Sequence, residues 1–262
     1  MSASAGDELL FSVDEGIARI VLNRPAQRNA LTLAMYEGLI RHCEAIAADP
    51  SVRALVIAGA GGKAFAAGTD IGEFRAFRTA EDALGYERFM DRVLGAIETL
   101  PVPVIAAVAG ACTGGGAAIA AACDLRVATR DARFGFPIAR TLGNCLSQSN
   151  LKRLCDLIGP ARVKDILFTA RLVGAEEALA IGLVGEVAAD APALDSRVTA
   201  LAVLLAGHAP LTMRATKEGL RRLAAEGVRP ADDLILSCYM SEDFREGMEA
   251  FLGKRAPAWK GR

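Results

Sequence analysis

The sequence predicts an α/β fold in which parallel strands are joined by crossover helices and followed by a helical C-terminal region. Through about residue 139, short apolar segments typical of buried strands alternate with segments of helical period, and this order implies parallel strands with helices between them. From residue 140 onward, helical patterns follow one another and strand patterns almost vanish. We therefore expect a core over residues 1–200 and a helical region over residues 201–262.

The N-terminal third shows this alternation element by element. Two runs of alternating apolar and polar residues around a turn signal predict a β-hairpin. Farther on, Asp70 and Glu73 have the spacing of a capping box, which predicts one helical region that runs on to Leu100. The elements expected before it are strands at Leu9–Val13 and Ile17–Leu22, a helix at Leu33–Ala48 and a strand at Ala54–Ala58.

The central stretch Val104–Val127 combines a buried strand, three consecutive glycines and an alanine-rich helix. The glycines Gly114, Gly115 and Gly116 let the backbone approach another group closely, and the helix after them offers unpaired N–H groups and its positive dipole end. Since that helix has almost no functional side chains, chemistry here would use backbone donors to stabilise a developing negative charge. A tightly packed helix crossing is the alternative.

The C-terminal helices carry apolar residues on more faces than one subunit can bury. A neighbouring subunit is expected to cover such a surface, so we expect an oligomer. The predicted helices are Asn144–Leu157, Ala161–Thr169, Ala175–Ile181, Leu194–Ala206, Leu211–Ala225, Ala231–Met240 and Asp243–Leu252. The apolar positions concerned are Leu220, Leu223, Leu234, Ile235, Leu236, Met240, Phe244, Met248, Phe251 and Leu252.

Composition excludes several classes of function. The 262 residues are 52% hydrophobic and carry a net charge of −1, without a basic stripe, so nucleic acid is not the expected ligand. The N-terminus lacks the pattern of a signal peptide and no apolar run reaches membrane-spanning length, so we expect a cytoplasmic protein without membrane association. Six scattered cysteines and two histidines predict reduced thiols and no metal site.

Five motifs in the right order resemble the crotonase, or enoyl-CoA hydratase/isomerase, superfamily. They are LNRPAQRNAL (22–31), KAFAAGTDI (63–71), the glycine turn with Cys123-Asp124-Leu125, ARFGFP (132–137) and EDFREGMEAFLGKRAPAWKG (242–261). The resemblance implies a spiral of ββα units with a C-terminal trimerisation region, assembled as a homo-trimer or hexamer. It also implies an acyl-CoA thioester substrate, with coenzyme A as part of that substrate and no separate cofactor. Two backbone N–H groups would hold the thioester oxygen as an enolate forms.

The resemblance assigns site residues position by position. Ala67 and Gly115 match the two N–H donors. The substrate-binding positions that match are Arg28, Ala66, Gly68, Thr69, Asp70, Ile71, Gly114, Ala118, Ile138, Phe251 and Lys254. For Arg28 and Lys254 the alternative is a solvated surface charge, and for Asp70 it is a helix cap.

Two glutamates that the family's hydratases use are missing. The matching positions hold Ala118 and Ile138, or Ala139 in place of Ile138 if a local one-residue insertion is placed earlier. None of these side chains can deprotonate water or protonate a carbon. Cys145 is the candidate replacement acid/base if Asn144 caps a helix there, although a packing role is the alternative. Arg140 and Thr141 could instead hold a substrate carboxylate.

Three functions therefore remain open. The first is a lyase or isomerase of this family that works through an enolate, by hydration, isomerisation, decarboxylation or C–C cleavage, of which decarboxylation needs no strong base. The second is a CoA-ester-binding protein with little catalysis. The third, a serine hydrolase, is disfavoured because His42 and His208 are the only histidines and neither falls in a site-like context.

Overall fold

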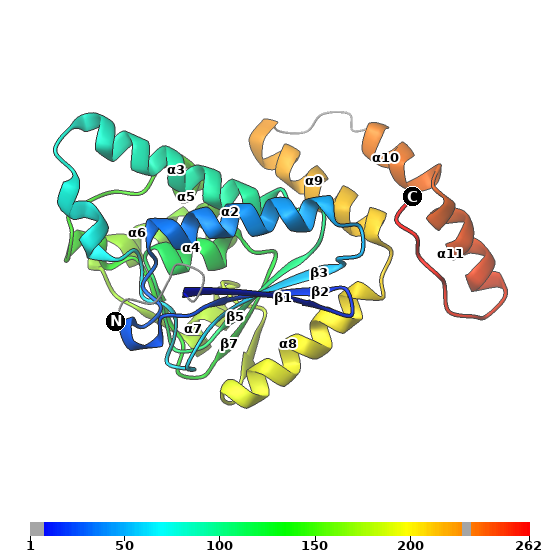
Figure 1. The fold of residues 1–262 in the computed structure, drawn as a ribbon, viewed down its shortest axis with the longest axis horizontal. Coiled ribbons are helices and arrows are strands. Elements are labelled where there is room, and N and C mark those ends of the chain that lie inside the picture. Colours follow the sequence, from blue (N-terminus) through cyan, green and yellow to red (C-terminus); the bar gives the residue numbers. More distant parts are fainter. Residues whose placement is uncertain (1–7, 227–231) are drawn as a thin grey trace.

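The computed structural model describes residues 8–226 and 232–262. A six-stranded sheet lies at the centre of the molecule and helices cover both of its faces (Figure 1). Its strand order is β1-β2-β3-β5-β7-β10, in which β1 is antiparallel to β2 and every other neighbouring pair is parallel. The strands are β1 (Leu9–Asp14), β2 (Ile17–Leu22), β3 (Ala54–Gly59), β5 (Val104–Val108), β7 (Leu125–Thr129) and β10 (Glu186–Ala188).

A second sheet of four short strands runs beside the first in the order β4-β6-β8-β9. Its strands are β4 (Ala64–Ala66), β6 (Ala111–Thr113), β8 (Arg133–Gly135) and β9 (Val173–Gly174), of which β9 alone pairs antiparallel. Each turn of the chain adds one strand to each sheet before a helical segment: β3 and β4, β5 and β6, then β7 and β8. This repeat is the predicted spiral of ββα units.

The helices divide between the two faces of the large sheet. One face packs on α8, where Leu194, Val198 and Ala202 meet the strand residues Val56 and Ile105. The other face forms the larger core with α2, α3 and α4. The bounds are α2 (Leu33–Ala48), α3 (Ala80–Glu98), α4 (Gly115–Ala122), α5 (Gln148–Ile158), α6 (Pro160–Thr169), α7 (Ala175–Ala180) and α8 (Ala191–Ala206), with short 3-10 helices η1 (Pro25–Gln27), η2 (Ile71–Ala76) and η3 (Pro137–Ala139).

The single helical region predicted from Asp70 to Leu100 is wrong. It is divided into η2 and α3, and Asp70 caps only η2, because its Oδ1 accepts the Gly72 N–H at 3.0 Å. Glu73 does not complete a capping box, since its carboxylate accepts the Leu33 N–H instead. The reciprocal box forms one element later, between Thr79 and Asp82 at the start of α3.

The C-terminal arm comprises α9 (Pro210–Glu226), α10 (Asp232–Tyr239), α11 (Glu242–Leu252) and residues 253–262. Figure 1 shows α10 and α11 standing away from the sheet, beyond α9. Lys217 of α9 fixes the arm to the core through an ion pair with Asp124 at 2.7 Å. The expected boundary at residue 200 falls inside α8, and the chain changes direction only at the corner between α8 and α9.

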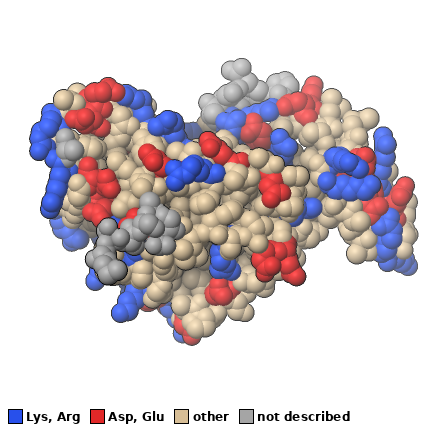
Figure 2. Space-filling model, viewed as in Figure 1, with Lys and Arg blue, Asp and Glu red and all other residues tan. Residues whose placement is uncertain are grey.

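The surface of the arm combines exposed apolar side chains with paired charges. Both signs of charge are visible along it in Figure 2. One such pair joins Lys260 and Glu242 at 3.2 Å. In the described part of the chain, no single helix meets the length and hydropathy that a membrane span needs, although α8 and α9 pass together as a pair bent by 103°.

Candidate active site

A cleft of about 880 Å³ opens where α3, the segment after β4, the start of α4 and the loop after η3 meet. Its described lining consists of Ala67, Gly68, Thr69, Ile71, Phe74, Tyr86, Glu87, Met90, Thr113, Gly114, Gly115, Ala118, Phe136, Pro137, Ile138, Thr141, Leu142, Asn144, Leu146 and Asn150. The predicted glycine turn and the segment 67–71 therefore do meet, although almost fifty residues of chain separate them.

The first wall of the cleft is backbone. Helix α4 begins at Gly115, its cap residue Gly114 has φ 52°, and no side chain caps its free N–H groups. Gly116 must be glycine, because a Cβ there would lie 2.4 Å from the carbonyl oxygen of Ala66 in β4. The close contact of α4 with β4 thus presents the helix N-terminus to the cleft, where it favours negative charge.

The assignment of Ala67 as the first N–H donor is wrong in this structure. Its N–H donates to the carbonyl oxygen of Arg28 at 3.0 Å and is not available to a ligand. Thr69 forms a parallel bridge with Leu31, in which the partners of Leu31 are the Gly68 oxygen and the Asp70 N–H. Because successive peptide groups of an extended segment face opposite sides, the N–H of Thr69 points away from Leu31. It has no acceptor among the residues the structure describes.

The two free donors lie close together. A Cβ built on Gly68 would be 4.0 Å from the Gly115 nitrogen, and one built on Gly115 would be 3.1 Å from the Thr69 hydroxyl oxygen. Gly68 itself has φ +106°, a backbone conformation in the region that favours glycine. The chain thus brings the N–H groups of Thr69 and Gly115 to one edge of the cleft, each without a partner in the described structure.

Three hydroxyl groups lie in a row beside these donors. The Thr69 Oγ1 is 2.9 Å from the Tyr36 Oη and 2.7 Å from the Tyr86 Oη. Burial raises the pKa of Tyr36 far above its usual range, and burial also raises that of Tyr86, so both phenols stay protonated at neutral pH. Sequence reasoning missed this row, because the three residues come from three separate elements and share no motif.

The second wall of the cleft is helix α3, which contributes Tyr86, Glu87 and Met90. Glu87 is half-buried, and it forms no ion pair with any residue that the structure describes. Burial, and then the negative charge of Asp91, raise the pKa of Glu87, while a hydrogen bond from the Ser147 backbone lowers it. Sequence reasoning missed Glu87 as well. The available signal was its spacing: Glu87 stands three residues before Met90 and seven before Leu94, so it lies on the same face of the helix as these two buried residues.

The remaining wall is mainly apolar. Ala118 is buried on α4 and Ile138 is half-buried in η3, and both line the cleft. Methyl and sec-butyl groups therefore stand at the two positions for which the resemblance implies glutamates. Thr141 lines the cleft too, with its hydroxyl donating to the Pro137 oxygen at 3.0 Å, whereas Arg140 is exposed and not part of the lining.

The structure does not bring every predicted site residue to the cleft. Ile71, Gly68 and Gly114 line it, but Ala66 is buried in β4 beneath α4. Asp70 is bound to Arg24 at 3.0 Å and does not line the cleft, which bears out its role as a cap.

Charged residues expected near coenzyme A lie outside the cleft of the same chain. The exposed Arg28 has a left-handed conformation, with φ 51°, at the end of η1. Lys254 is exposed after α11 with φ 49°. Phe251 belongs to α11, and its side chain is outside the described part of the structure.

The premises for Cys145 as an acid or base are wrong. The predicted helix at Asn144–Leu157 starts at Gln148, with Ser147 as its cap, so Cys145 is not in a first helical turn. Ser147 is the N-cap in place of Asn144, because its side chain accepts the Asn150 N–H at 3.2 Å. Cys145 is exposed, which also contradicts the packing role, and it does not line the cleft.

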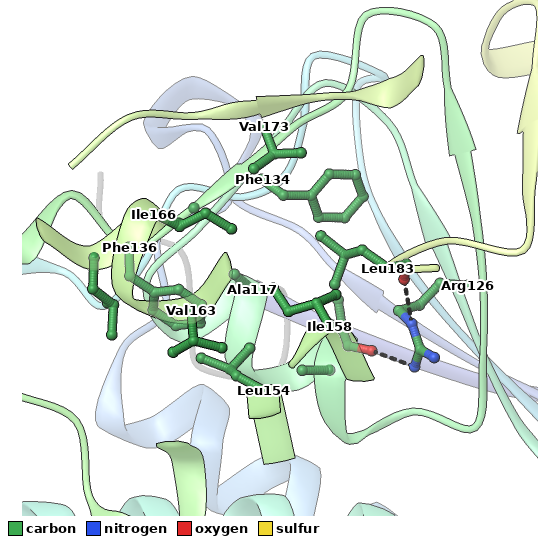
Figure 3. Close-up of a pocket in the computed structure, with 14 residues that line it drawn as sticks. Ala117, Arg126, Phe134, Phe136, Leu154, Ile158, Val163, Ile166, Val173 and Leu183 are labelled. Carbon is green, nitrogen blue, oxygen red and sulfur yellow. Dashed lines mark hydrogen bonds between the residues drawn. The ribbon is translucent and has the colours of Figure 1, made fainter. Parts of the chain in front are cut away.

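A second, apolar cavity lies beside α4, where Ala117, Phe134 and Leu154 are among the residues that line it (Figure 3). Among its described lining residues Arg126 alone is charged, and it donates to the backbone oxygens of Leu183 at 2.7 Å and Ala120 at 3.2 Å. These bonds explain how a buried guanidinium is tolerated without a carboxylate. The cavity belongs to the packing between α4, α5 and α6 and offers no group for chemistry.

Comparison with known proteins shows the family to which the chain is similar. The model of the enoyl-CoA hydratase/isomerase family matches residues 12–262. The chain is 34% identical to the crotonyl-CoA hydratase of Syntrophomonas wolfei, over 96% of this chain and 97% of that protein. It is also 34% identical to the 2,3-dehydroadipyl-CoA hydratase of Escherichia coli, over 97% and 99%.

A solved structure agrees in fold. The enoyl-CoA hydratase/carnithine racemase from Magnetospirillum magneticum is 36% identical and superimposes with a TM-score of 0.91, covering 98% of this chain and 96% of that one. The chain therefore belongs to the enoyl-CoA hydratase/isomerase family of the crotonase superfamily. The resemblance inferred from the five motifs is confirmed.

Proposed function

We propose that this protein is an enzyme that binds an acyl-CoA thioester with its carbonyl oxygen between the N–H groups of Thr69 and Gly115. The observation that carries the proposal is the pair of unpartnered backbone donors at one edge of a cleft, the second at the start of α4. Thr69 replaces Ala67 in this role, because the Ala67 N–H is already bonded to Arg28.

Such a pair lowers the free energy of an enolate more than that of the neutral thioester. The negative charge on the oxygen grows during the reaction, and fixed donors stabilise it without reorganising. Removal of one donor of this kind typically costs about 10²–10³ in kcat. The dipole of α4 acts in the same direction.

The reaction that the relatives' names favour is addition of water to an enoyl-CoA, or movement of its double bond. The apolar side chains of Ala118 and Ile138 speak against the two-glutamate version of that chemistry. They favour, as the second candidate, decarboxylation of an acyl-CoA, since loss of CO₂ itself produces the enolate without a strong base. Cleavage of another C–C bond of an acyl-CoA is kept beside it as a lyase reaction. A CoA-ester-binding protein with little catalysis is the third.

We also propose a homo-trimer or hexamer. Most of the apolar residues named on the arm are exposed, including Leu220 at 61%, Met240 at 65% and Leu252 at 81%, whereas Leu234 is half-buried. A surface of this kind is normally covered by another subunit. Because Lys254 does not line the cleft of its own chain, a role for it in binding coenzyme A would require a neighbouring subunit.

The test of the oxyanion site compares Thr69→Pro with Thr69→Ala. Proline removes the N–H and the hydroxyl, whereas alanine removes only the hydroxyl, so the difference between the variants reports the N–H. Acetoacetyl-CoA is the probe, because its bound enolate has its own ultraviolet absorption. We expect wild type and Thr69→Ala to bind the enolate form and a folded Thr69→Pro to lose it. Equal enolate absorption in all three would overturn the assignment.

Turnover of crotonyl-CoA by the wild-type protein separates the candidate reactions. Binding of acetoacetyl-CoA with no turnover of any enoyl-CoA or carboxyacyl-CoA would support the binding protein. Failure of the wild type to bind any CoA thioester would overturn the proposed function as a whole.

A further inference from the structure

We infer that Glu87 is the catalytic acid–base group of this site and transfers the proton at the α-carbon of the bound thioester, an inference that rests on the proposed function. It fills the role for which Ala118 and Ile138 have no suitable side chain. Glu87 lines the cleft from α3, and Thr69 and Gly115, which carry the two backbone donors, line the same cleft.

The first support is position. The residue before Glu87, Tyr86, is linked by its hydroxyl to Thr69 at 2.7 Å, and Thr69 carries one of the two donors. Helix α3 is therefore held directly against the loop that would bind the thioester oxygen. Met90, one turn later, lines the cleft as well, so this face of α3 looks into it along more than one turn.

The second support is that Glu87 forms no ion pair with any described residue, although it accepts a hydrogen bond from the Ser147 backbone N–H. Other carboxylates near the cleft are occupied: Glu73 accepts the Leu33 N–H, and Asp91 accepts the Ser147 hydroxyl at 2.8 Å. Among the described residues that line the cleft there is no other carboxyl group and no histidine, cysteine, lysine or arginine. A half-buried carboxylate without a cationic partner is costly to keep for packing alone.

The surroundings of Glu87 also suit a base. Burial and the charge of Asp91 raise its pKa, and the Ser147 backbone N–H opposes them. On its own helix it is further flanked by the neutral phenol of Tyr86, and the cleft-lining residues of the facing loop, Thr141 and Asn144, are uncharged. A carboxyl with a raised pKa holds a proton more strongly, which makes it the better base.

The step balances with the groups present. The α-C–H bond breaks, its proton goes to the Glu87 carboxylate, and the electron pair moves onto the thioester oxygen held by Thr69 and Gly115. For an enoyl thioester, Glu87 takes a proton from water as the water oxygen bonds to the β-carbon. It then returns that proton to the α-carbon, so that one H₂O is added and the carboxylate is regenerated.

The test is exchange of the α-hydrogens of butyryl-CoA with D₂O, followed by NMR and compared with the uncatalysed rate. We expect Glu87→Gln to slow exchange by about 10²-fold or more. Glu81→Gln is the matched control, because Glu81 lies on the same helix, is exposed and pairs with Arg88 outside the cleft. It should exchange at the wild-type rate.

The pH profile adds a readout that a structural role would not change. Wild-type exchange should fall in acid with a limb above the usual carboxyl range, because the proton-accepting form disappears there. Asp91→Asn removes a negative charge that faces Glu87, so it should move the limb to lower pH. In Glu87→Gln the limb should be absent.

Binding of acetoacetyl-CoA keeps the two proposals distinguishable. A wild type that binds this ligand while Glu87→Gln exchanges as fast as wild type overturns the role of Glu87 and leaves the oxyanion site standing. A wild type that binds but shows no exchange above background also overturns it. Absence of binding in the wild type overturns the proposed function itself.

Discussion

The core sheet and the C-terminal arm both carry large apolar residues but bury them differently. All five residues of β5 are buried, with both faces of the strand covered by helices. In α10, by contrast, none of the described residues is buried, and Ile235 and Leu236 are more than half exposed. The hydrophobic driving force is therefore satisfied within one chain in the core sheet. In the C-terminal arm it is not.

This difference indicates which part of the protein can fold alone. The core completes its own packing, while the arm touches the rest of the chain mainly through α9, the Lys217 ion pair and a hydrogen bond from Trp259 to the Gly207 oxygen at 3.0 Å. Burial of apolar area contributes about 25 cal/mol per Å², so under the proposed trimer or hexamer the arm would gain much of its stability from the subunit that covers it.

Deletion of residues 231–262 should give the largest effect, because it removes most of the C-terminal arm and leaves the core sheet intact. We expect the shortened protein not to form the proposed trimer or hexamer while its core stays folded, because the buried core clusters contain no described residue of α10 or α11. Light scattering gives the mass and circular dichroism gives the fold. A full-length protein that runs as a monomer of 27.4 kDa at micromolar concentration would contradict the prediction before any deletion is made.

Two phenylalanine truncations test the contrast between buried and exposed apolar residues within the core region. Phe65 in β4 is completely buried, and Phe65→Ala should lower the free energy of unfolding by about 3–5 kcal/mol because it leaves a cavity. Phe168 on α6 is 78% exposed, and the same truncation there should change it by no more than about 0.5 kcal/mol. Denaturant unfolding at one protein concentration measures both, and similar losses at the two positions would refute the contrast.

Sequence periodicity predicted several elements well. The hairpin, α2, the strand at β5 and the start of α4 at the glycine turn all form as expected, because each has several residues of consistent pattern. The second sheet was missed, since β4, β6 and β8 have only three residues each and therefore no measurable period. The close approach of Gly116 to Ala66 packs α4 against β4, the first of these strands.

The site was predictable in place but not in detail. The motifs identified both loops, yet the choice between Ala67 and Thr69 depends on which way a peptide N–H points, and that is set by the bridge between Leu31 and Thr69. Nothing local in the sequence encodes that bridge. Glu87 was missed for a different reason, because a charged residue on an exposed-looking helix is usually solvated.

Glycine substitutions extend the comparison to the border of the cleft. A Cβ on Gly115 would lie 2.0 Å from the Tyr36 hydroxyl oxygen, so Gly115→Ala should lower stability by about 1–3 kcal/mol through overpacking. Tyr36→Phe in the same protein removes that oxygen and should restore part of the loss. Gly219 on α9 has room, with the nearest atom 3.6 Å away, so Gly219→Ala should be neutral or stabilising. Thermal unfolding of the wild type, Gly115→Ala, Gly115→Ala with Tyr36→Phe, and Gly219→Ala measures these changes in stability. A neutral Gly115→Ala would show that the residues around Gly115 can move to admit a methyl group.

The smallest effect concerns Asp70 and its pH dependence. The Gly72 N–H, and then the hydrogen bond from Arg24, lower the pKa of Asp70 below its ordinary value. A carboxylate with a lowered folded-state pKa stabilises the protein above the unfolded-state pKa and loses that contribution as the pH falls through the folded-state value. Asp70→Asn keeps a capping side chain but removes the charge, so it should cost at most about 1 kcal/mol at neutral pH, since the pair with Arg24 is partly exposed to solvent. The difference between wild type and variant should shrink toward zero in acid, below the ordinary range of a carboxyl pKa. Denaturant unfolding at several pH values follows it, and a difference that stays constant with pH would assign the whole effect to packing around η2.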